Sequence, residues 1–292
     1  MLVRNTFLLI VALTVSSPIK YAAKPNPRDV ELKKLNYKIE MLRSKEAILE
    51  RLGPTDLVTL SRFYRQLGDF YMRSKSALLG AISYRKAYSL NPTESELKLR
   101  AGLAYAHTNQ LELSHQLLVE FLNESNSETL KFQAEQELYK ICLTLGEKEN
   151  NLSLWNQAVK WYEKAMQYST SPRNSLDLVD RIQTAYFKQG TFHYSQKHFL
   201  EAAENLRKTL NKNTRESLRS KVERLGVTLF LNAAKHFERI EDRDEAIKYY
   251  IVIRDFLYKS TAVDYARQRL KALQSEDNIP LQSAPGWLVT TQ

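Results

Sequence analysis

The five histidines are the first candidates for chemistry in this chain, because imidazole can bind a metal ion or carry a proton near neutral pH. His193 and His198 are close in sequence, but a spacing of five residues does not place two side chains on one face of a helix. No cysteine and histidine are spaced as zinc ligands are. We therefore expect ordinary structural roles, and no metal site, for His107, His115, His193, His198 and His236.

The carboxylates and the single cysteine form no catalytic arrangement either. Glu241, Asp242 and Asp244 lie between two predicted helices, where carboxylates favour turns and helix N-caps over acid-base catalysis. Cys142 is the single cysteine and is interpreted as a buried core thiol. The sequence has no Gly-rich phosphate loop, nucleophile elbow or metalloprotease motif. It predicts no catalytic, cofactor-binding or metal-binding residues, so we do not expect an enzyme.

The composition indicates a folded, helical chain. Hydrophobic residues make up 43% of the 292 residues, which is enough for a continuous core. Only 8 Gly and 8 Pro interrupt the chain, against 16 Tyr and 11 Phe. Few helix breakers and long apolar periodicities favour an all-α fold over a turn-rich β fold.

Residues 63–92 carry a specific pattern of small, aromatic and proline residues. The pattern resembles the tetratricopeptide repeat (TPR), a family of stacked helical hairpins that bind other proteins. Two helices are implied, and Pro92 ends the unit because proline cannot continue a helix. The matching residues are Tyr64, Leu67, Gly68, Tyr71, Gly80, Tyr84, Ala87 and Pro92.

The repeat continues with a changed period. A second unit follows after 34 residues, with Gly102 in the place of Gly68, and the small residue of the second helix then recurs every 44 residues. That residue is Ser114, Ala158, Ala202 and Ala246 in turn. Ten extra, proline-free residues precede each later unit, and the simplest interpretation lengthens each first helix at its start by about 15 Å. Glu149 departs from the family pattern, which has Tyr there, so the first helix of that unit is expected to end early.

The resemblance therefore implies an all-α, right-handed α-solenoid of about five TPR-like hairpins over residues 61–260. Residues 28–52 form a separate amphipathic helix whose leucines have coiled-coil spacing. This helix either packs on the solenoid or mediates self-association. Residues 261–275 are expected to form a capping helix and residues 276–292 a flexible tail, in which Trp287-Leu288-Val289 could dock into a groove.

The N-terminus resembles an export signal. Arg4 precedes a run of about ten apolar residues, Thr6 to Val15, which is too short to span a membrane. We interpret residues 1–23 as a signal peptide and expect the chain in a bacterial periplasm, with secretion or an uncleaved membrane anchor as alternatives. The formal charge of +10 becomes 10 − 2 = +8 without Arg4 and Lys20. This surplus favours acidic partners or the membrane periphery, whereas dispersed charges argue against nucleic acid.

By family resemblance, the first helices line a concave groove that binds extended protein segments. The positions that face this groove are Arg62, Arg65, Asp69 and Arg73 in the first unit; Thr184, Phe187, Thr191 and Ser195 in the fourth; and Thr228, Leu231, Lys235 and Arg239 in the fifth. The expected function is a non-enzymatic scaffold or adaptor of a cell-envelope complex. One alternative is an accessory subunit of an outer-membrane assembly, secretion or motility complex. Another is a glycan-binding protein or enzyme that uses Phe187 and Tyr194.

Overall fold

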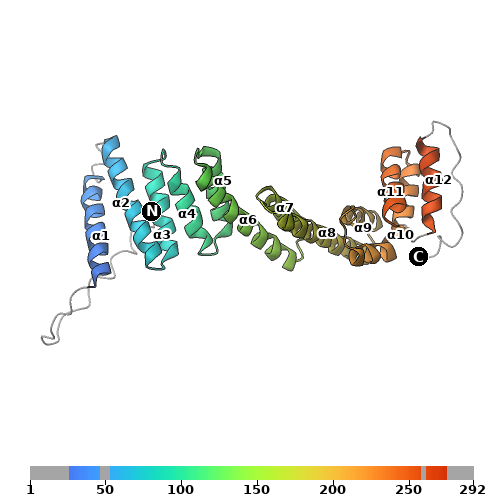
Figure 1. The fold of residues 1–292 in the computed structure, drawn as a ribbon, viewed down its shortest axis with the longest axis horizontal. Helices are drawn as coiled ribbons and strands as arrows, with labels where there is room; N and C mark the ends of the chain where they lie inside the picture. Colours follow the sequence, from blue (N-terminus) through green and yellow to red (C-terminus); the bar gives the residue numbers. More distant parts are fainter. Residues whose placement is uncertain (1–25, 47–52, 258–260, 275–292) are drawn as a thin grey trace, which may run out of the picture. The chain divides into compact units, whose positions relative to one another are not determined.

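A computed structural model describes residues 26–46, 53–257 and 261–274 (Figure 1). The predicted signal peptide, residues 47–52 of the predicted N-terminal helix and the tail 276–292 lie outside these described residues. Within them the chain is all-α and contains no strand, as the sequence predicts. The helices are α1 (Pro27–Glu46), α2 (Pro54–Arg73), α3 (Ala77–Leu90), α4 (Glu96–Ala106), α5 (Leu111–Glu124), α6 (Glu128–Asn151), α7 (Trp155–Gln167), α8 (Pro172–Ser195), α9 (Phe199–Thr209), α10 (Glu216–Arg239), α11 (Arg243–Phe256) and α12 (Ala262–Gln274).

The chain divides into two compact units, Met1–Leu97 and Lys98–Gln292. In the first unit, α2 and α3 form a hairpin that is closed by a hydrogen bond from Ser61 Oγ to the carbonyl oxygen of Ala87 (2.8 Å). Helix α1 packs on α2, which buries Leu35. The described part of the predicted N-terminal helix is thus confirmed as helical, and it packs against its own chain.

The hairpins of both units share one internal register. In the third hairpin a Cβ atom added to Gly146 would lie 2.5 Å from the ring of Tyr162, sixteen positions later. Gly68 approaches Tyr84, and Gly190 approaches Leu206, at the same spacing. The glycines therefore allow the two helices of each hairpin to touch, which confirms the repeat pattern found in the sequence.

The turn inside each hairpin also repeats. It contains one residue with φ close to +60°, and the five residues are Lys75, Asn109, Ser153, Lys197 and Glu241. The next amide bonds back to the third-last helical carbonyl, for example from His198 N–H to His193 (2.9 Å), which is the Schellman motif. Glycine usually occupies the left-handed position, yet none of these five residues is glycine. The motif fixes where every second helix begins.

The lengthened first helices are confirmed, since α6, α8 and α10 each span 24 residues. Their added first halves pack on the helix that precedes them in the chain. Ala134 of α6 joins the cluster of Leu118 on α5, Leu178 of α8 joins that of Ala158 on α7, and Val222 of α10 joins that of Leu206 on α9. The extra residues of the 44-residue period thus bury a longer stretch of the preceding helix.

The expected early end of the first helix at Glu149 is wrong, because α6 continues to Asn151. Leu145 and Gly146 are buried on the core-facing side of the last turns of α6, so no aromatic ring is needed at Glu149. Its backbone carbonyl accepts the Schellman hydrogen bond from Leu154 N–H (2.9 Å). Position in the turn, not side-chain type, keeps this residue helical.

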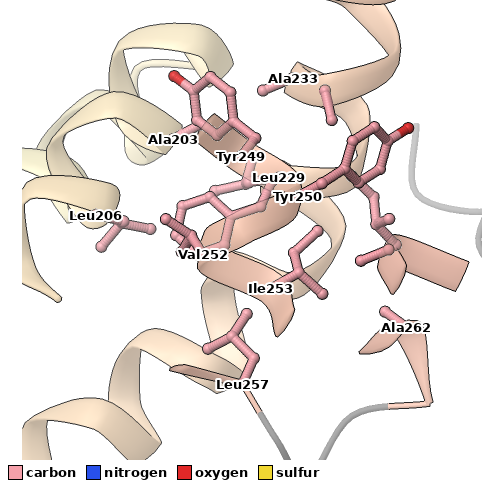
Figure 2. Close-up of a cluster of buried hydrophobic side chains, with 14 of the residues drawn as sticks. Ala203, Leu206, Leu229, Ala233, Tyr249, Tyr250, Val252, Ile253, Leu257 and Ala262 are labelled. Atoms are coloured by element: carbon pink, nitrogen blue, oxygen red, sulfur yellow. The ribbon is translucent and has the colours of Figure 1, made fainter. Parts of the chain in front are cut away.

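The last hairpin and α12 share one hydrophobic cluster (Figure 2). Figure 2 shows Leu206 of α9 on one side of α11 and Ala262 of α12 on the other. Arg269 of α12 also pairs with Glu238 of α10 at 3.1 Å, and both side chains are almost fully buried. Helix α12 therefore covers the end of the stack, as predicted for residues 261–275.

Candidate partner-binding surface

The four groove residues predicted in the first unit are mostly engaged within the chain. Arg65 pairs with Glu94 at 2.6 Å, and Arg73 pairs with Glu31 of α1 at 2.7 Å. Asp69 accepts a hydrogen bond from the Tyr84 hydroxyl (2.7 Å). Arg62 is exposed. Two of the three arginines of the predicted basic rim are thus paired with neighbouring carboxylates, although exposed pairs of this kind contribute only about 0–1 kcal/mol.

The predicted positions on α8 are divided between core and surface. Phe187 is half-buried and packs against the cluster of the last hairpin, and Thr184 is half-buried. Thr191 donates its hydroxyl hydrogen to the carbonyl oxygen of Lys188 (2.8 Å). Tyr194 and Ser195 are exposed at the C-terminal end of the helix. Of the two aromatic residues predicted there, only Tyr194 presents its ring to solvent.

Helix α10 departs most from the predicted groove. Leu231 is 1% exposed, so its prediction as a groove residue is wrong: it belongs to the core cluster of the last hairpin. Lys235 is half-buried, with its ammonium 5.7 Å from the ring of Tyr265 on α12. Thr228 and Arg239 are exposed. The capping helix therefore contacts a side chain that the family pattern assigns to the groove.

A second surface, which the sequence analysis did not identify, lies at the turns of the third and fourth hairpins. We call it the aromatic turn surface, and it consists of Leu152, Leu154, Trp155, Phe192, Tyr194, Phe199 and Leu200. All except the half-buried Trp155 are exposed. The Trp155 and Phe192 rings lie 5.6 Å apart and join the two turns, and the Tyr194 and Phe199 rings lie 6.0 Å apart. The surface is therefore continuous across two hairpins.

The Schellman turns explain this arrangement. Each turn reverses the chain within three residues, so the last residues of α8 and the first of α9 lie together. Phe192 and Phe199 flank the turn outside the core register, which is set by Gly190 and Ala202. Exposed apolar residues gathered in this way mark interaction sites more often than scattered ones do.

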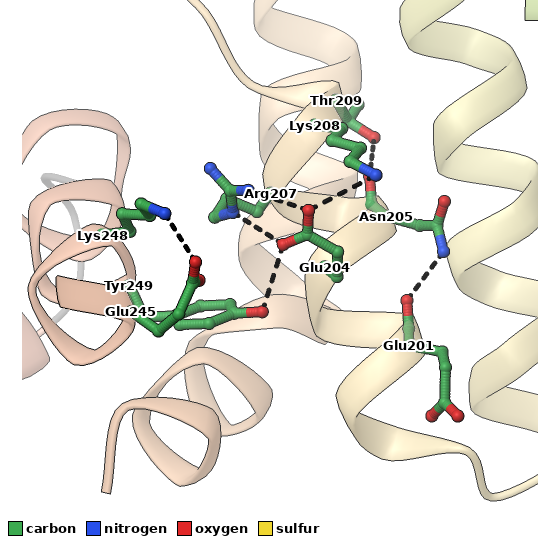
Figure 3. A network of polar contacts seen from close by, with 9 residues as sticks. All are labelled: Glu201, Glu204, Asn205, Arg207, Lys208, Thr209, Glu245, Lys248 and Tyr249. Atoms are coloured by element: carbon green, nitrogen blue, oxygen red, sulfur yellow. Dashed lines mark hydrogen bonds and ion pairs between the residues drawn. The ribbon is translucent and has the colours of Figure 1, made fainter. Parts of the chain in front are cut away.

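An open hollow of about 610 Å³ adjoins this surface. Leu200 and His193 belong to its wall, and the other lining residues lie on α7, α8, α9, α10 and α11. Glu204 is at the centre of a polar network there, paired with Arg207 at 2.8 Å and accepting a hydrogen bond from the Tyr249 hydroxyl at 3.2 Å (Figure 3). Burial alone would raise the pKa of Glu204, but hydrogen bonds and charges from Arg207 and Lys208 outweigh it and hold the pKa below its ordinary value.

Two polar atoms of the hollow's wall have no hydrogen-bond partner within the described chain. They are Oε1 of Gln189, a side chain 9% exposed, and Nδ1 of His193, which follows one turn later on α8. A buried acceptor without a partner costs about 1–3 kcal/mol. Glu201 adds an exposed carboxylate, which has no bonded partner in the network of Figure 3. The hollow thus presents unmatched acceptors beside apolar walls.

His193, His198, His115 and Cys142 pack against neighbouring side chains or are buried. The His193 and His198 rings approach to 6.0 Å because the turn folds them together, although they share no helix face. His115 packs edge-on against Trp161, and burial lowers its pKa. Cys142 is buried.

Across residues 26–46, 53–257 and 261–274, no three His, Cys, Asp or Glu side chains are grouped closely enough to hold a metal ion. Among the described helices, none combines the length and apolar character that crossing a membrane requires.

The repeated contacts and turns define a protein of stacked helical hairpins, whose residue pattern resembles the tetratricopeptide repeat. No protein-family model matches the sequence, and no curated protein does either. Solved structures give weak similarities. BtubC (BKLC) from P. vanneervenii is 14% identical over 89% of this chain and 97% of that chain, with a TM-score of 0.28. PilF of Pseudomonas aeruginosa is 14% identical over 83% and 97%, with a TM-score of 0.27. A TPR protein from Cytophaga hutchinsonii is 15% identical over 86% and 95%, with a TM-score of 0.29. Because TM-scores this low carry no argument, the resemblance to the tetratricopeptide repeat rests on the chain's own residues and packing.

Proposed function

We propose that the chain is a non-enzymatic scaffold that binds protein segments in a bacterial cell envelope, in the periplasm. The aromatic turn surface carries this proposal. Trp, Tyr and Phe contribute the most binding energy per residue at protein interfaces, and two adjacent hairpins hold them in fixed positions. The envelope location is supported by the signal-like residues 1–23.

The surface offers a direct test with a matched control. Phe192 and Phe132 are both phenylalanines on helices, exposed by 48% and 49%, but only Phe192 belongs to the aromatic turn surface. A photo-crosslinking amino acid at Phe199 should capture a discrete protein partner in cells that express the chain. Phe192→Ser should abolish that crosslink, and Phe132→Ser should leave it unchanged. Equal losses in both variants would contradict the proposal.

A lipid surface is the competing occupant, because exposed aromatic residues also bind membrane interfaces. Flotation of purified residues 24–292 with phosphatidylglycerol vesicles separates the two. We expect no flotation. Flotation that Phe192→Ser abolishes would replace a protein partner with a membrane as the ligand of this surface.

The location needs its own measurement. An alkaline phosphatase fused after residue 292 should be active in a bacterial host, and deletion of residues 2–17 should abolish this activity. An active fusion without those residues, or an inactive one with them, would contradict export.

A further inference from the structure

We propose that the hollow beside the aromatic turn surface receives the guanidinium group of an arginine side chain from an extended partner segment. This inference rests on the proposed function, since it names the chemistry of the partner. The hollow opens among α7, α8, α9, α10 and α11 of the second unit and meets the aromatic turn surface at Leu200.

The acceptors of the hollow select a donor-rich ligand. Gln189 Oε1 is an acceptor with no partner, and the exposed carboxylate of Glu201 lies in the same lining. Nδ1 of His193 is also without a partner and accepts a hydrogen bond when the ring proton is on Nε2. A guanidinium carries five N–H donors on a planar group and no acceptor, so it can serve several of these atoms at once.

The other charges of the hollow do not compete for this role. Lys208 lies in the lining, but its ammonium is 3.4 Å from the Glu204 carboxylate. Glu245 is paired with Lys248 at 2.5 Å. Glu201 is therefore the carboxylate of the lining left to attract an incoming cation. An anionic ligand would instead meet the Gln189 oxygen and three carboxylates.

The walls fit the rest of an arginine side chain. Leu200, Phe237 and Tyr249 line the same hollow and can contact the methylene stem and the flat face of the guanidinium. The Gln189 oxygen and Nδ1 of His193 are both shielded from solvent in the free chain, so the guanidinium reaches them after a rotamer change of Gln189 or His193. An apolar residue next to the arginine would then lie on Phe199.

The test uses a single arginine and its neutral isostere. Residues 24–292, labelled with ¹⁵N, are titrated with Nα-acetyl-arginine methylamide and separately with the citrulline analogue. We expect the arginine probe to shift the Gln189 side-chain amide with a dissociation constant of roughly 1–10 mM. Citrulline, which has the same shape without the charge, should bind at least about tenfold more weakly.

Two variants test the assigned contacts. Followed through the backbone amides of Leu200 and Glu204, which both variants keep, Glu201→Gln and Gln189→Leu should each weaken arginine binding by about fivefold. Glu128→Gln, which removes an exposed carboxylate on α6 far along the chain, should have no effect. Equal affinity for citrulline, no shift of Gln189 at 50 mM arginine probe, or full binding by both variants would overturn the inference.

The outcomes also separate this inference from the proposed function. A protein crosslink at Phe199 together with no arginine binding would remove the arginine site and leave the scaffold intact. Arginine binding without any crosslinked protein would count against the scaffold, and the site would then take a free cationic ligand.

Discussion

The contact between Gly146 and Tyr162 gives the sharpest test of the repeat register. A Cβ atom at position 146 would lie 2.5, 2.6 and 3.1 Å from three ring atoms of Tyr162, well inside the carbon–carbon optimum of about 3.5–4.0 Å. Tyr162 is 2% exposed, so its ring has no free space to move into. Overpacking of this kind costs about 1–3 kcal/mol.

A second effect of Gly146→Ala has the opposite sign. Alanine stabilises a helix interior by about 0.8–1.0 kcal/mol relative to glycine. We therefore expect Gly146→Ala to destabilise the chain by a net value of about 0–2 kcal/mol. In a Tyr162→Ala background the ring is absent, and the same substitution should stabilise by about 1 kcal/mol. The coupling free energy between the two sites should then be about 1–3 kcal/mol.

Urea unfolding followed by tryptophan fluorescence is suited to this cycle, because Trp155 and Trp161 both lie on α7 of the same hairpin. The fifth hairpin supplies the control. It already has Ala234 opposite Tyr250, and both are fully buried, so Ala234→Gly should destabilise by about 1 kcal/mol even though it restores the glycine of the pattern. A coupling energy near zero between positions 146 and 162 would refute the register.

Four further perturbations follow from the packing and the turns. Lys197→Gly should raise the melting temperature, because a side chain in the left-handed region costs about 1 kcal/mol. Lys212→Gly, in a loop without positive φ, should not raise it. Equal shifts of the melting temperature in both variants would show that the turn is not strained. Glu238→Ala should cost about 3–5 kcal/mol because it leaves Arg269 charged and buried, while Glu238→Leu with Arg269→Met should recover most of that loss in a denaturant titration. Burial raises the pKa of Cys142 to about 12, so a thiol reagent at pH 8 should react only after unfolding; rapid native reaction would contradict its placement. The pKa of Glu204 is lowered in the folded chain, so its ionised form stabilises the fold above the ordinary pKa of 4.5, and this stability is lost as the pH falls further. Glu204→Gln should therefore flatten acid unfolding below about pH 5, measured by circular dichroism.

The sequence predicted the repeat because its signals are local and periodic. Glycines and alanines that permit helix contact recur at fixed spacing, and ten added proline-free residues can only lengthen a helix that they adjoin. The prediction at Glu149 was wrong because the Schellman motif depends on backbone geometry, and the five left-handed residues have no residue type in common. No single-residue signal marks them as one feature.

The binding surface was harder to predict because its exposure depends on neighbours outside the motif. Arg73 is paired by Glu31 of α1, and Lys235 contacts Tyr265 of α12, both of which lie beyond the repeats. Leu231 is an apolar residue at a position that the family pattern assigns to the groove, but it is buried in the core. A usable signal was nevertheless present at the turns. Phe199 and Leu200 are adjacent apolar residues just before the small residue Ala202, where the repeat pattern requires none.

Exposed large hydrophobic side chains are more numerous at the inner turns of the later hairpins than at the opposite end, where Phe132 and Leu176 are exposed. This difference indicates the side from which a partner approaches. At the turns inside the hairpins, Leu152, Leu154, Phe199 and Ile240 are exposed. The connections between hairpins are polar instead, and the described residues 125–127, 169–171 and 211–215 include no exposed large hydrophobic side chain. The lengthened starts of α6, α8 and α10 cover apolar surface near those connections, whereas no helix among the described residues covers the inner turns in the same way. Exposed apolar side chains that gather in one place mark interaction sites, so this difference supports the partner proposed at the inner turns.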